Sequence, residues 1–298
     1  MSGPPDDAPL AVIVVNYQSY DELRDCLTSL RAAGDHHRVI VVDHASEAAA
    51  ADALTTAFPE VLFLPVAANE GFAAGVNRGA RAAAGSPFIL LLNPDCVVQP
   101  ATCDTLLAWM RAHPGVGAAG PRIHNADGTL QPTARKFPDF TTGIAGRSSW
   151  LTRVLPKNPL SRHNLLGRED ADEALDVDWV SGACLIARRD AFESIGGMDE
   201  GFFLYWEDAD FCRRLHHAGW RIVYLPAATI THVGGRSSRH SKHASLEAFH
   251  RSAFRLYWKH ASSPGRLLAP LVFGALRVRL MVMKQIVRRR ASTAHRTV

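Results

Sequence analysis

Short apolar runs alternate with amphipathic segments through the first third of the chain. The runs are rich in aliphatic and β-branched residues and are short enough for buried strands, whereas the segments between them repeat their apolar residues at helical spacing. Ser19 and Glu22 have the capping-box spacing that starts a helix, and Gly34 stands where that helix should end. The pattern predicts strands at 10–15, 39–42, 61–64 and 88–92, separated by helices at 19–33, 48–58 and 73–84.

This regular order of strands and helices predicts an α/β fold with a mostly parallel central sheet flanked by helices, because consecutive parallel strands need a crossover connection. Ligands of such sheets bind beyond the carboxyl ends of the strands. Asn16, Asp43 and the triplet Asn93-Pro94-Asp95 stand at three of these ends. We therefore expect their polar side chains to meet in one crevice.

The pattern changes in the second half of the chain. Prolines, glycines and basic residues dominate 121–176, which predicts an irregular insertion. A strand is expected at 177–188, a helix at 208–219 and a strand at 221–225, and the pattern is helical from Ser245 to the end.

Composition excludes several classes of protein. The 298 residues are 47% hydrophobic and 21% charged, as in a globular domain, and the net charge of +4 is mild. The basic residues gather late in the chain, which favours a phosphate-bearing or anionic partner, and no nucleic-acid-binding motif is visible. Five cysteines without a C-x-x-C pair argue against a disulfide framework or a zinc site, so a reducing cytoplasm is expected.

The first candidate residues for chemistry stand near the end of the strand at 88–92. The carboxylate of Asp95 is well placed to hold a divalent cation on a diphosphate, although Asn, Pro and Asp are also common in turns. Asn69 and Asn77 belong to a glycine-rich segment whose Gly75 and Gly79 lie on one helix face. That segment matches neither the dinucleotide-binding nor the Walker pattern, and close packing on the sheet explains its glycines.

Two later segments contain further candidates. Glu207, Asp208 and Asp210 follow an aromatic run, and a carboxylate at the edge of an apolar pocket can act as a general base with a raised pKa. Acidic residues are also favoured in the first turn of a helix, so the same pattern fits a helix start. His232 follows the strand at 221–225 and precedes two glycines, where it would either complete a metal site or serve the structure.

Together these segments resemble the family 2 glycosyltransferases of the GT-A fold, and most closely their rhamnosyltransferase branch. The resemblance extends from about Leu10 to Ser237, and the N-P-D triplet and the segment 127–138 resemble that branch. Each motif is weak alone, but their order along the chain is that of the family. The matching stretches are VIVVNY at 12–17, VVDHAS at 41–46, NEGFAAGVNRG at 69–79, LNPD at 92–95, WVSGA at 179–183, GMDE at 197–200 and YWEDAD at 205–210.

The resemblance implies an inverting glycosyltransferase that uses a nucleotide-sugar donor and a divalent metal, Mg²⁺ or Mn²⁺. Asp43 would recognise the base, and Asp208 would be the catalytic base. Asp95 would bind the metal with His232, in a D-x-D motif whose first position is Asn93. The donor side would also include Asn16, Asn69, Gly71, Asn77 and Asn93, and the acceptor side Trp179, Gly182 and Glu207.

The same resemblance divides the chain into a flexible N-terminus at 1–9, a GT-A catalytic domain at 10–240 and a basic helical segment at 245–298. Within the catalytic domain, 10–97 would bind the nucleotide, 121–176 would be an insertion on the acceptor side, and 177–240 would form the acceptor and catalytic half. Some members of the branch act on polyprenyl-diphosphate-linked sugars in cell-wall or O-antigen assembly. This implies a dTDP-rhamnose donor and a glycan or polyprenyl-diphosphate-linked acceptor.

Three alternatives remain at this point. The same fold could use a UDP-hexose or another donor. A sugar-nucleotide pyrophosphorylase would need a glycine-rich basic loop, and Asn16-Tyr17-Gln18-Ser19 stands in that place. A catalytically inactive nucleotide-sugar-binding partner would not need Asp43, Asp95 and Asp208 together.

The C-terminal segment 267–287 is largely apolar, but it contains a proline and several cations and so does not predict a membrane span. One interpretation is a helix packed on the catalytic domain. The other is an in-plane helix on the anionic inner leaflet of the cell membrane, which would place the enzyme peripherally at the cytoplasmic face. The helix would begin after Pro270, with Arg277, Lys284 and Arg288 on one face and an apolar face formed by Val272, Leu276, Leu280, Met283 and Val287.

Overall fold

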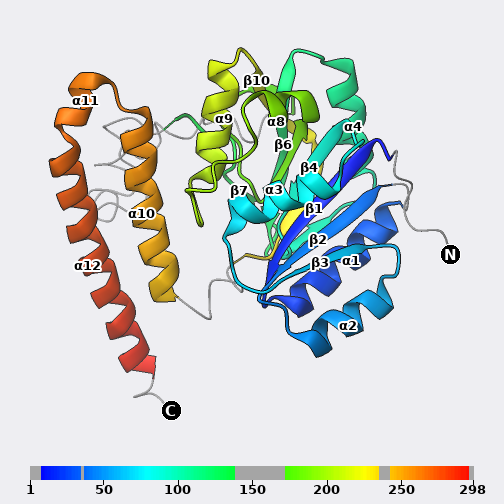
Figure 1. Cartoon of the computed structure of the whole chain (residues 1–298), viewed down its shortest axis with the longest axis horizontal. Helices are drawn as coiled ribbons and strands as arrows, with labels where there is room; N and C mark the ends of the chain where they lie inside the picture. Colours follow the sequence, from blue (N-terminus) through cyan, green and yellow to red (C-terminus); the bar gives the residue numbers. More distant parts are fainter. Residues whose placement is uncertain (1–7, 35–36, 138–171, 235–241, 295–298) are drawn as a thin grey trace.

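The computed structural model describes residues 8–34, 37–137, 172–234 and 242–294. Most of the expected flexible N-terminus at 1–9 and of the expected insertion at 121–176 therefore lies outside the described residues. Helices cover both faces of a central sheet, and two long helices, α10 and α12, stand together to one side of it (Figure 1).

The sheet contains ten strands among the described residues. They are β1 (Leu10–Tyr17), β2 (Arg38–His44), β3 (Leu62–Val66), β4 (Phe88–Leu92), β5 (Cys96–Val98), β6 (Val116–Asn125), β7 (Leu130–Gln131), β8 (Leu175–Asp176), β9 (Cys184–Arg188) and β10 (Arg221–His232). The helices are α1 (Tyr20–Ala33), α2 (Ala48–Ala57), α3 (Phe72–Ala82), α4 (Thr102–Ala112), α8 (Arg189–Ser194), α9 (Glu207–His217), α10 (Lys242–His260), α11 (Ser263–Leu267) and α12 (Ala269–Ala294).

The predicted parallel half of the sheet is confirmed. Its strand order is β3-β2-β1-β4, and every neighbouring pair in it is parallel. Beyond β4 the sheet becomes mixed, because β9 runs antiparallel between β4 and β6, while β10 is parallel to β6. The carboxyl ends of β1, β2 and β4 consequently lie side by side, with Asn16 in register with Asp43.

The two faces of the sheet bury different side chains. Val12 and Val14 of β1 join the core under α1 and α4, whereas Ile13 and Val15 join the core under α3 and α9. This alternation follows from the two-residue period of a strand. Both faces are apolar, which explains why the central strands appear as uninterrupted apolar runs in the sequence.

Close packing accounts for the two glycines of α3. A Cβ on Gly75 would lie 2.7 Å from Val15 Cγ1, and one on Gly79 would lie 2.5 Å from Ile13 Cγ2. These contacts are too short for any side chain, so α3 approaches β1 only because both positions are glycine. The packing interpretation of these two residues is therefore confirmed.

Several predicted boundaries were wrong. The capping box at Ser19 does not form, because its hydroxyl donates to Tyr17 O at 3.2 Å instead of capping α1. The strand expected at 177–188 is limited to β9, and the one expected to end at Leu225 continues as β10 to His232. That continuation needs a register shift between Leu225 and Thr229, which the sequence pattern did not reveal. The start of the expected insertion at Pro121 falls inside β6.

The helical C-terminal segment forms a hairpin, in which α12 packs on α10 (Figure 1). Lys259 and His260 of α10 contact Asp210 of α9. The apolar face predicted for α12 is buried or half-buried, with Leu280 only 9% exposed. The interpretation that this face would enter a bilayer is therefore wrong, because the face is occupied by the hairpin itself. Within the described residues, no helix is both long and apolar enough to cross a membrane.

Candidate active site

Asn16 and Asp43 lie buried at the carboxyl ends of β1 and β2. Asn16 Nδ2 donates a hydrogen bond of 2.7 Å to Asp43 Oδ1, and the Tyr20 hydroxyl donates one of 3.2 Å to Oδ2. The Tyr20 oxygen also accepts a hydrogen bond of 2.7 Å from the backbone N–H of Glu47. These contacts orient the Asp43 carboxylate, whose oxygens can still accept a further N–H.

Asp95 and His232 come together because β5 and β10 are antiparallel, with Cys96 opposite His232. Asp95 Oδ1 lies 3.1 Å from His232 Nε2, and His232 Nδ1 lies 3.0 Å from Gln131 Oε1. When Nδ1–H donates to Gln131, the Nε2 lone pair faces the Asp95 carboxylate. A bound cation would make this otherwise repulsive contact attractive, so the pair fits a metal site.

Cys96 is the third potential ligand in this cluster, with its Sγ within 4.8 Å of the Asp95 and His232 ligand atoms. Its Sγ contacts Ala183 O at 3.4 Å, and burial raises the pKa of the thiol well above its ordinary value. A protonated thiol is a poor ligand for a hard cation. Asp95 and His232 are therefore the two protein ligands that this cluster offers.

Asp208 stands in the first turn of α9. Its Oδ2 accepts a hydrogen bond of 3.0 Å from the backbone N–H of Gly182, and its Oδ1 accepts one of 2.8 Å from Ala209 N–H. Burial raises the pKa of Asp208, while these hydrogen bonds and the positive charge of Arg135 oppose the rise. Asp208 is thereby a stronger base than an exposed aspartate.

Glu207, the neighbour of Asp208, is only 7% exposed. Burial and the nearby charge of Asp208 raise the pKa of Glu207 well above its ordinary value. Its Oε2 has no hydrogen-bond partner among the described residues. The surroundings thus favour the proton on Glu207 and the negative charge on Asp208.

The loop between Val180 and β9 connects Asp208 to the Asn93-Pro94-Asp95 triplet. Gly182 leaves room for Asp208, because a Cβ there would already lie 3.3 Å from Asp208 Cβ. The next residue, Ala183, accepts a hydrogen bond of 2.9 Å from the backbone N–H of Asn93. Asn93 therefore positions the triplet through its backbone, and the two candidate catalytic segments are one hydrogen bond apart.

The aromatic residues before Glu207 adopt an unusual backbone. Tyr205 and Trp206 have φ values of 68° and 70°, a left-handed conformation that bulky residues rarely adopt. Such strain is typical of functional sites. In this conformation Trp206 lies 6.3 Å from Trp179, which was predicted on the acceptor side, measured between ring centroids.

The segment containing Asn69 and Gly71 packs on the loop that leads to these aromatic residues. Asn69 Oδ1 accepts a hydrogen bond of 3.0 Å from Gly71 N–H, and a Cβ on Gly71 would lie 2.5 Å from Phe203 O. The backbone N–H of Phe72 donates to the same Phe203 oxygen at 2.8 Å. Asn69 and Gly71 therefore shape this contact between the segment before α3 and the loop that contains Phe203.

Asn77 serves the fold, contrary to its prediction as a donor-binding residue. Its Nδ2 donates hydrogen bonds of 2.9 Å to Met198 O and to Glu200 Oε1, and its Oδ1 accepts one of 2.9 Å from Met198 N–H. Both amide hydrogens are thus in use. Gly197 is required beside it, because a Cβ there would lie 2.7 Å from Asn77 Oδ1.

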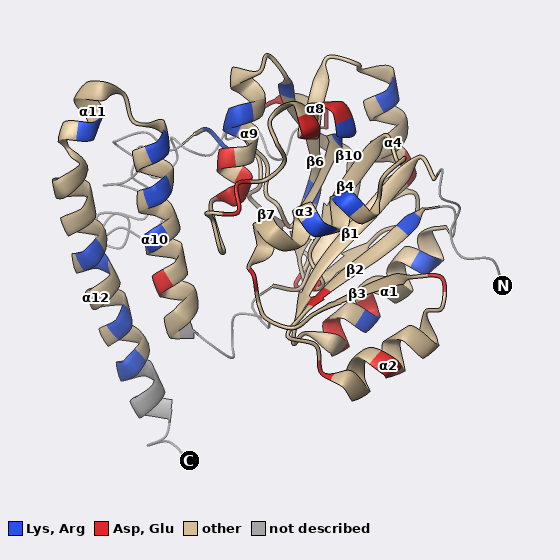
Figure 2. Cartoon of the chain, viewed as in Figure 1, with Lys and Arg blue, Asp and Glu red and all other residues tan. Residues whose placement is uncertain are grey.

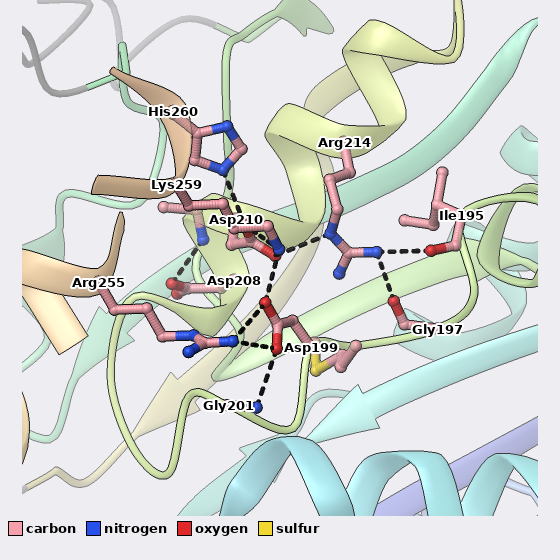
Figure 3. Close-up of polar contacts among 12 residues, drawn as sticks. Ile195, Gly197, Asp199, Gly201, Asp208, Asp210, Arg214, Arg255, Lys259 and His260 are labelled. Atoms are coloured by element: carbon pink, nitrogen blue, oxygen red, sulfur yellow. Dashed lines mark hydrogen bonds and ion pairs between the residues drawn. The ribbon is translucent and has the colours of Figure 1, made fainter. Parts of the chain in front are cut away.

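A buried ion-pair cluster holds α9 against α10 (Figure 3). Asp210 Oδ2 accepts hydrogen bonds from Arg214 Nε at 2.8 Å and Lys259 Nζ at 3.0 Å, and its Oδ1 lies 2.7 Å from His260 Nε2. Burial opposes ionisation, yet His260, Lys259 and Arg214 lower the pKa of Asp210 to about 2. Lys259 also contacts Asp199 at 2.6 Å, so the cluster fixes the hairpin two residues from Asp208.

Five residues at or near the site had no role in the sequence analysis. They contact the predicted residues only through folding over long sequence separations, and their types are common on surfaces and in turns. No sequence signal distinguishes them, except that two lie in the segment 127–138, which resembles the rhamnosyltransferase branch. They are Tyr20, Gln131, Arg135, Lys259 and His260.

A family described as "Glycosyltransferase like family 2" matches residues 5–257. The chain belongs to this family. It is therefore a glycosyltransferase, as the resemblance implied, and Asp208 and the Asp95–His232 pair occupy the same edge of its GT-A sheet.

Two relatives of this glycosyltransferase are rhamnosyltransferases by name. The N-acetylglucosaminyl-diphospho-decaprenol L-rhamnosyltransferase of Mycobacterium tuberculosis is 35% identical over 256 residues, which cover 82% of each chain. Rhamnosyltransferase WbbL of Escherichia coli is 26% identical over 271 residues, which cover 87% of this chain and 92% of the relative.

Solved structures confirm the fold. GalNAc-T7 with UDP, GalNAc and Mn²⁺ superposes with a TM-score of 0.60 at 14% identity, covering 85% of this chain and 48% of that one. The mannosyltransferase PcManGT of Pyrobaculum calidifontis, in complex with GDP-Man and Mn²⁺, superposes with a TM-score of 0.56 at 15% identity. The superposition covers 96% of this chain and 80% of that one. At these identities the likeness concerns the fold alone.

The different surroundings of Asp208 and Glu207 predict that amide substitution lowers turnover much more at Asp208 than at Glu207. Asp208→Asn keeps the size of the side chain but cannot accept a proton, so turnover should fall by roughly a hundredfold or more while donor affinity stays nearly unchanged. Glu207→Gln keeps the neutral charge of a protonated Glu207, so its loss should be much smaller. Steady-state kinetics and donor titration measure both effects.

The dependence of kcat/KM on pH provides an independent check that an ionised Asp208 is needed. Asp208 must be ionised to accept a proton, so kcat/KM should rise with pH through a pKa above the ordinary aspartate value of 3.8. An active Asp208→Asn enzyme beside an inactive Glu207→Gln enzyme would show that Glu207 is the base.

Proposed function

We propose that the protein transfers rhamnose from dTDP-rhamnose, with inversion and with a divalent metal, to a hydroxyl of a polyprenyl-diphosphate-linked N-acetylglucosamine. The product would serve cell-wall or surface-polysaccharide assembly. The observation that carries the proposal is the buried, hydrogen-bonded base Asp208 on the same edge of the sheet as the Asp95–His232 pair. The names of the two rhamnosyltransferase relatives support the choice of sugar and acceptor.

The chemistry needs one base and no second nucleophilic carboxylate. Asp208 takes the proton of the acceptor hydroxyl as its oxygen attacks the anomeric carbon from the face opposite the leaving diphosphate, which inverts that centre. Glu207 remains protonated, so it neither competes for the proton nor repels the leaving anion. An inactive nucleotide-sugar-binding partner would have no need for a base held in this way.

The donor would be held by both ends of its nucleoside diphosphate. Asp95 and His232 would hold Mg²⁺ or Mn²⁺, which stabilises the negative charge that develops on the departing diphosphate. Asp43 would accept the ring N–H that thymine and uracil share, while Asn16 and Tyr20 orient its carboxylate. Because both bases present this group, a UDP-hexose donor is the alternative to dTDP-rhamnose. Similarity to the hexosyltransferase Agl10 of Haloferax volcanii, at 26% identity, supports this alternative.

We also propose that the hairpin contacts an anionic membrane surface. Leu271, Val278 and Val282 are spaced so as to form one stripe along α12, and they are 48% to 71% exposed. Lys and Arg residues line α10 and α12, whereas Glu247 is the single acidic residue in 242–294 (Figure 2). An apolar stripe beside cations such as Arg266 and Arg288 is the pattern of an in-plane membrane helix.

The metal assignment predicts that Asp95→Ala abolishes transfer without unfolding the protein, because the ion loses its only carboxylate ligand. EDTA should remove activity reversibly, and Mn²⁺ binding to the donor-free enzyme, followed by electron paramagnetic resonance, should weaken in both Asp95→Ala and His232→Ala. Full activity of the metal-stripped enzyme would refute the assignment.

The donor assignment predicts transfer from dTDP-rhamnose in a panel that also contains UDP-hexoses and GDP-mannose, with farnesyl-diphosphate-linked N-acetylglucosamine as acceptor. Mass spectrometry of the product and release of nucleoside diphosphate report on transfer and on donor hydrolysis. Turnover of a UDP-hexose alone would replace rhamnose as the donor sugar and leave the base and metal assignments standing.

If the exposed apolar stripe of α12 contacts the membrane, negative charges placed in it should weaken binding to lipid. Leu271→Glu combined with Val278→Glu should weaken binding to vesicles of anionic phospholipid by about tenfold or more, because apolar burial is lost. Ala53→Glu combined with Thr56→Glu, on the exposed face of α2, adds the same charge elsewhere and should bind as the unaltered protein does. If the intact protein ignores anionic vesicles at low salt, the stripe does not contact lipid.

A further inference from the structure

A row of aromatic rings leads from the catalytic carboxylates to the C-terminal hairpin. Trp206, which directly precedes Glu207, lies 6.3 Å from Trp179 and 5.3 Å from Phe249 of α10, measured between ring centroids. The guanidinium carbon of Arg279 on α12 lies 5.6 Å from the centroid of Phe249. The hairpin thus contributes one ring and one cation to the surroundings of Asp208.

Several polar atoms along this row have no hydrogen-bond partner among the described residues. They are Glu207 Oε2, Trp206 Nε1 and His250 Nε2, while the other ring nitrogen of His250 contacts Leu246 O at 2.7 Å. Glu207 and His250 are each more than nine-tenths buried. Folded proteins leave few buried polar groups unsatisfied, so three in one row indicate that a ligand with hydroxyl or amide groups completes them.

Arg279, the cation at the end of the row, lies beside His250. Burial lowers the pKa of the Arg279 guanidinium, and burial together with the charge of Arg279 lowers the pKa of His250. An anion bound beside the guanidinium would favour the charged form of both groups. A planar guanidinium resting on an aromatic face is also well suited to bidentate contact with phosphate.

The hairpin is held firmly enough to present these groups at a fixed distance from the base. Arg255 contacts Asp199 at 2.9 Å, Lys259 bridges Asp199 and Asp210, and His260 contacts Asp210 (Figure 3). Ser252 on the same helix donates a hydrogen bond of 2.9 Å to Leu204 O, in the loop that leads to Trp206.

We propose that Phe249 and Arg279 form the second half of the acceptor site, in which Trp206 and Phe249 stack on the acceptor sugar and Arg279 binds the diphosphate that follows it. This inference rests on the proposed function. These protein groups follow one another in the same order as the parts of such an acceptor that they would bind. Asp208 meets the hydroxyl, the aromatic rings meet the sugar, Arg279 meets the diphosphate, and the exposed stripe of α12 meets the lipid.

The diphosphate contact can be separated from the sugar contact with two acceptors that share the sugar. Farnesyl-diphosphate-linked N-acetylglucosamine contains the diphosphate, and octyl N-acetylglucosaminide does not. Arg279→Met should raise KM about tenfold or more for the first acceptor alone, with kcat and donor hydrolysis little changed. Arg279→Lys should restore part of the affinity. Phe249→Leu should raise KM for both acceptors, because both contain the sugar ring.

Arg277→Met is the matched control, since Arg277 lies on the same helix, is exposed and also stacks on a ring, at 5.9 Å from the centroid of Phe273. It should behave as the unaltered enzyme does. A loss in Arg279→Met that is equal for both acceptors, or equal to that of Arg277→Met, would overturn the diphosphate subsite.

A direct binding measurement keeps this inference separate from the proposed function. With the donor site filled by dTDP and Mn²⁺, farnesyl diphosphate should bind the full-length protein, and Arg279→Met should weaken that binding. If neither acceptor receives sugar while farnesyl diphosphate still binds through Arg279, the proposed function fails and the subsite stands. Equal binding of farnesyl diphosphate to both proteins would refute the subsite.

Discussion

The buried carboxylate of Asp210 is the constraint on which the catalytic half of the molecule depends. A fully buried anion is tolerated only when cations and donors surround it, and here they come from two helices. Arg214 belongs to the same helix and also donates to Ile195 O and Gly197 O at 2.8 Å and 2.7 Å, whereas Lys259 and His260 come from the hairpin. One charge thereby fixes the helix of the base, the loop before it and the appended helices.

Within that frame, two adjacent carboxylates acquire different properties from their surroundings. Asp208 receives two backbone hydrogen bonds and the field of Arg135, whereas Glu207 is buried with one oxygen unsatisfied. These surroundings favour the ionised form of Asp208 over that of Glu207. Sequence alone identified both as acidic residues at a helix start but had no basis for assigning the proton, because the assignment depends on Gly182 and Arg135, which are distant in the sequence.

The parallel half of the sheet could be predicted from the sequence because it is built from local units. Each strand and helix there has its own periodicity, and their alternation implies the topology, so Asn16 and Asp43 were correctly expected side by side. The mixed half depends on pairings across long separations. The sequence pattern led to no prediction for the segment 96–120, which forms β5, α4 and the start of β6. It also did not reveal that β10 continues past Pro226 through a register shift. His232 was identified as a candidate ligand only by resemblance and by its neighbouring glycines, because its contact with Asp95 depends on this pairing. Asn77 was misassigned for the same reason, since its partners Met198 and Glu200 lie more than a hundred residues away.

The contact between Gly71 and Phe203 has a thermodynamic consequence. Phe72 N–H donates to Phe203 O, and no side chain fits at Gly71, so the segment before α3 and the loop of aromatic residues cannot move independently. A ligand that orders one of these segments lowers the conformational entropy that the other must still lose on binding its own ligand. Because such coupling is reciprocal, a ligand bound to one segment and a ligand bound to the other would increase each other's affinity by the same factor. The absence of a single methyl group thus couples the two segments.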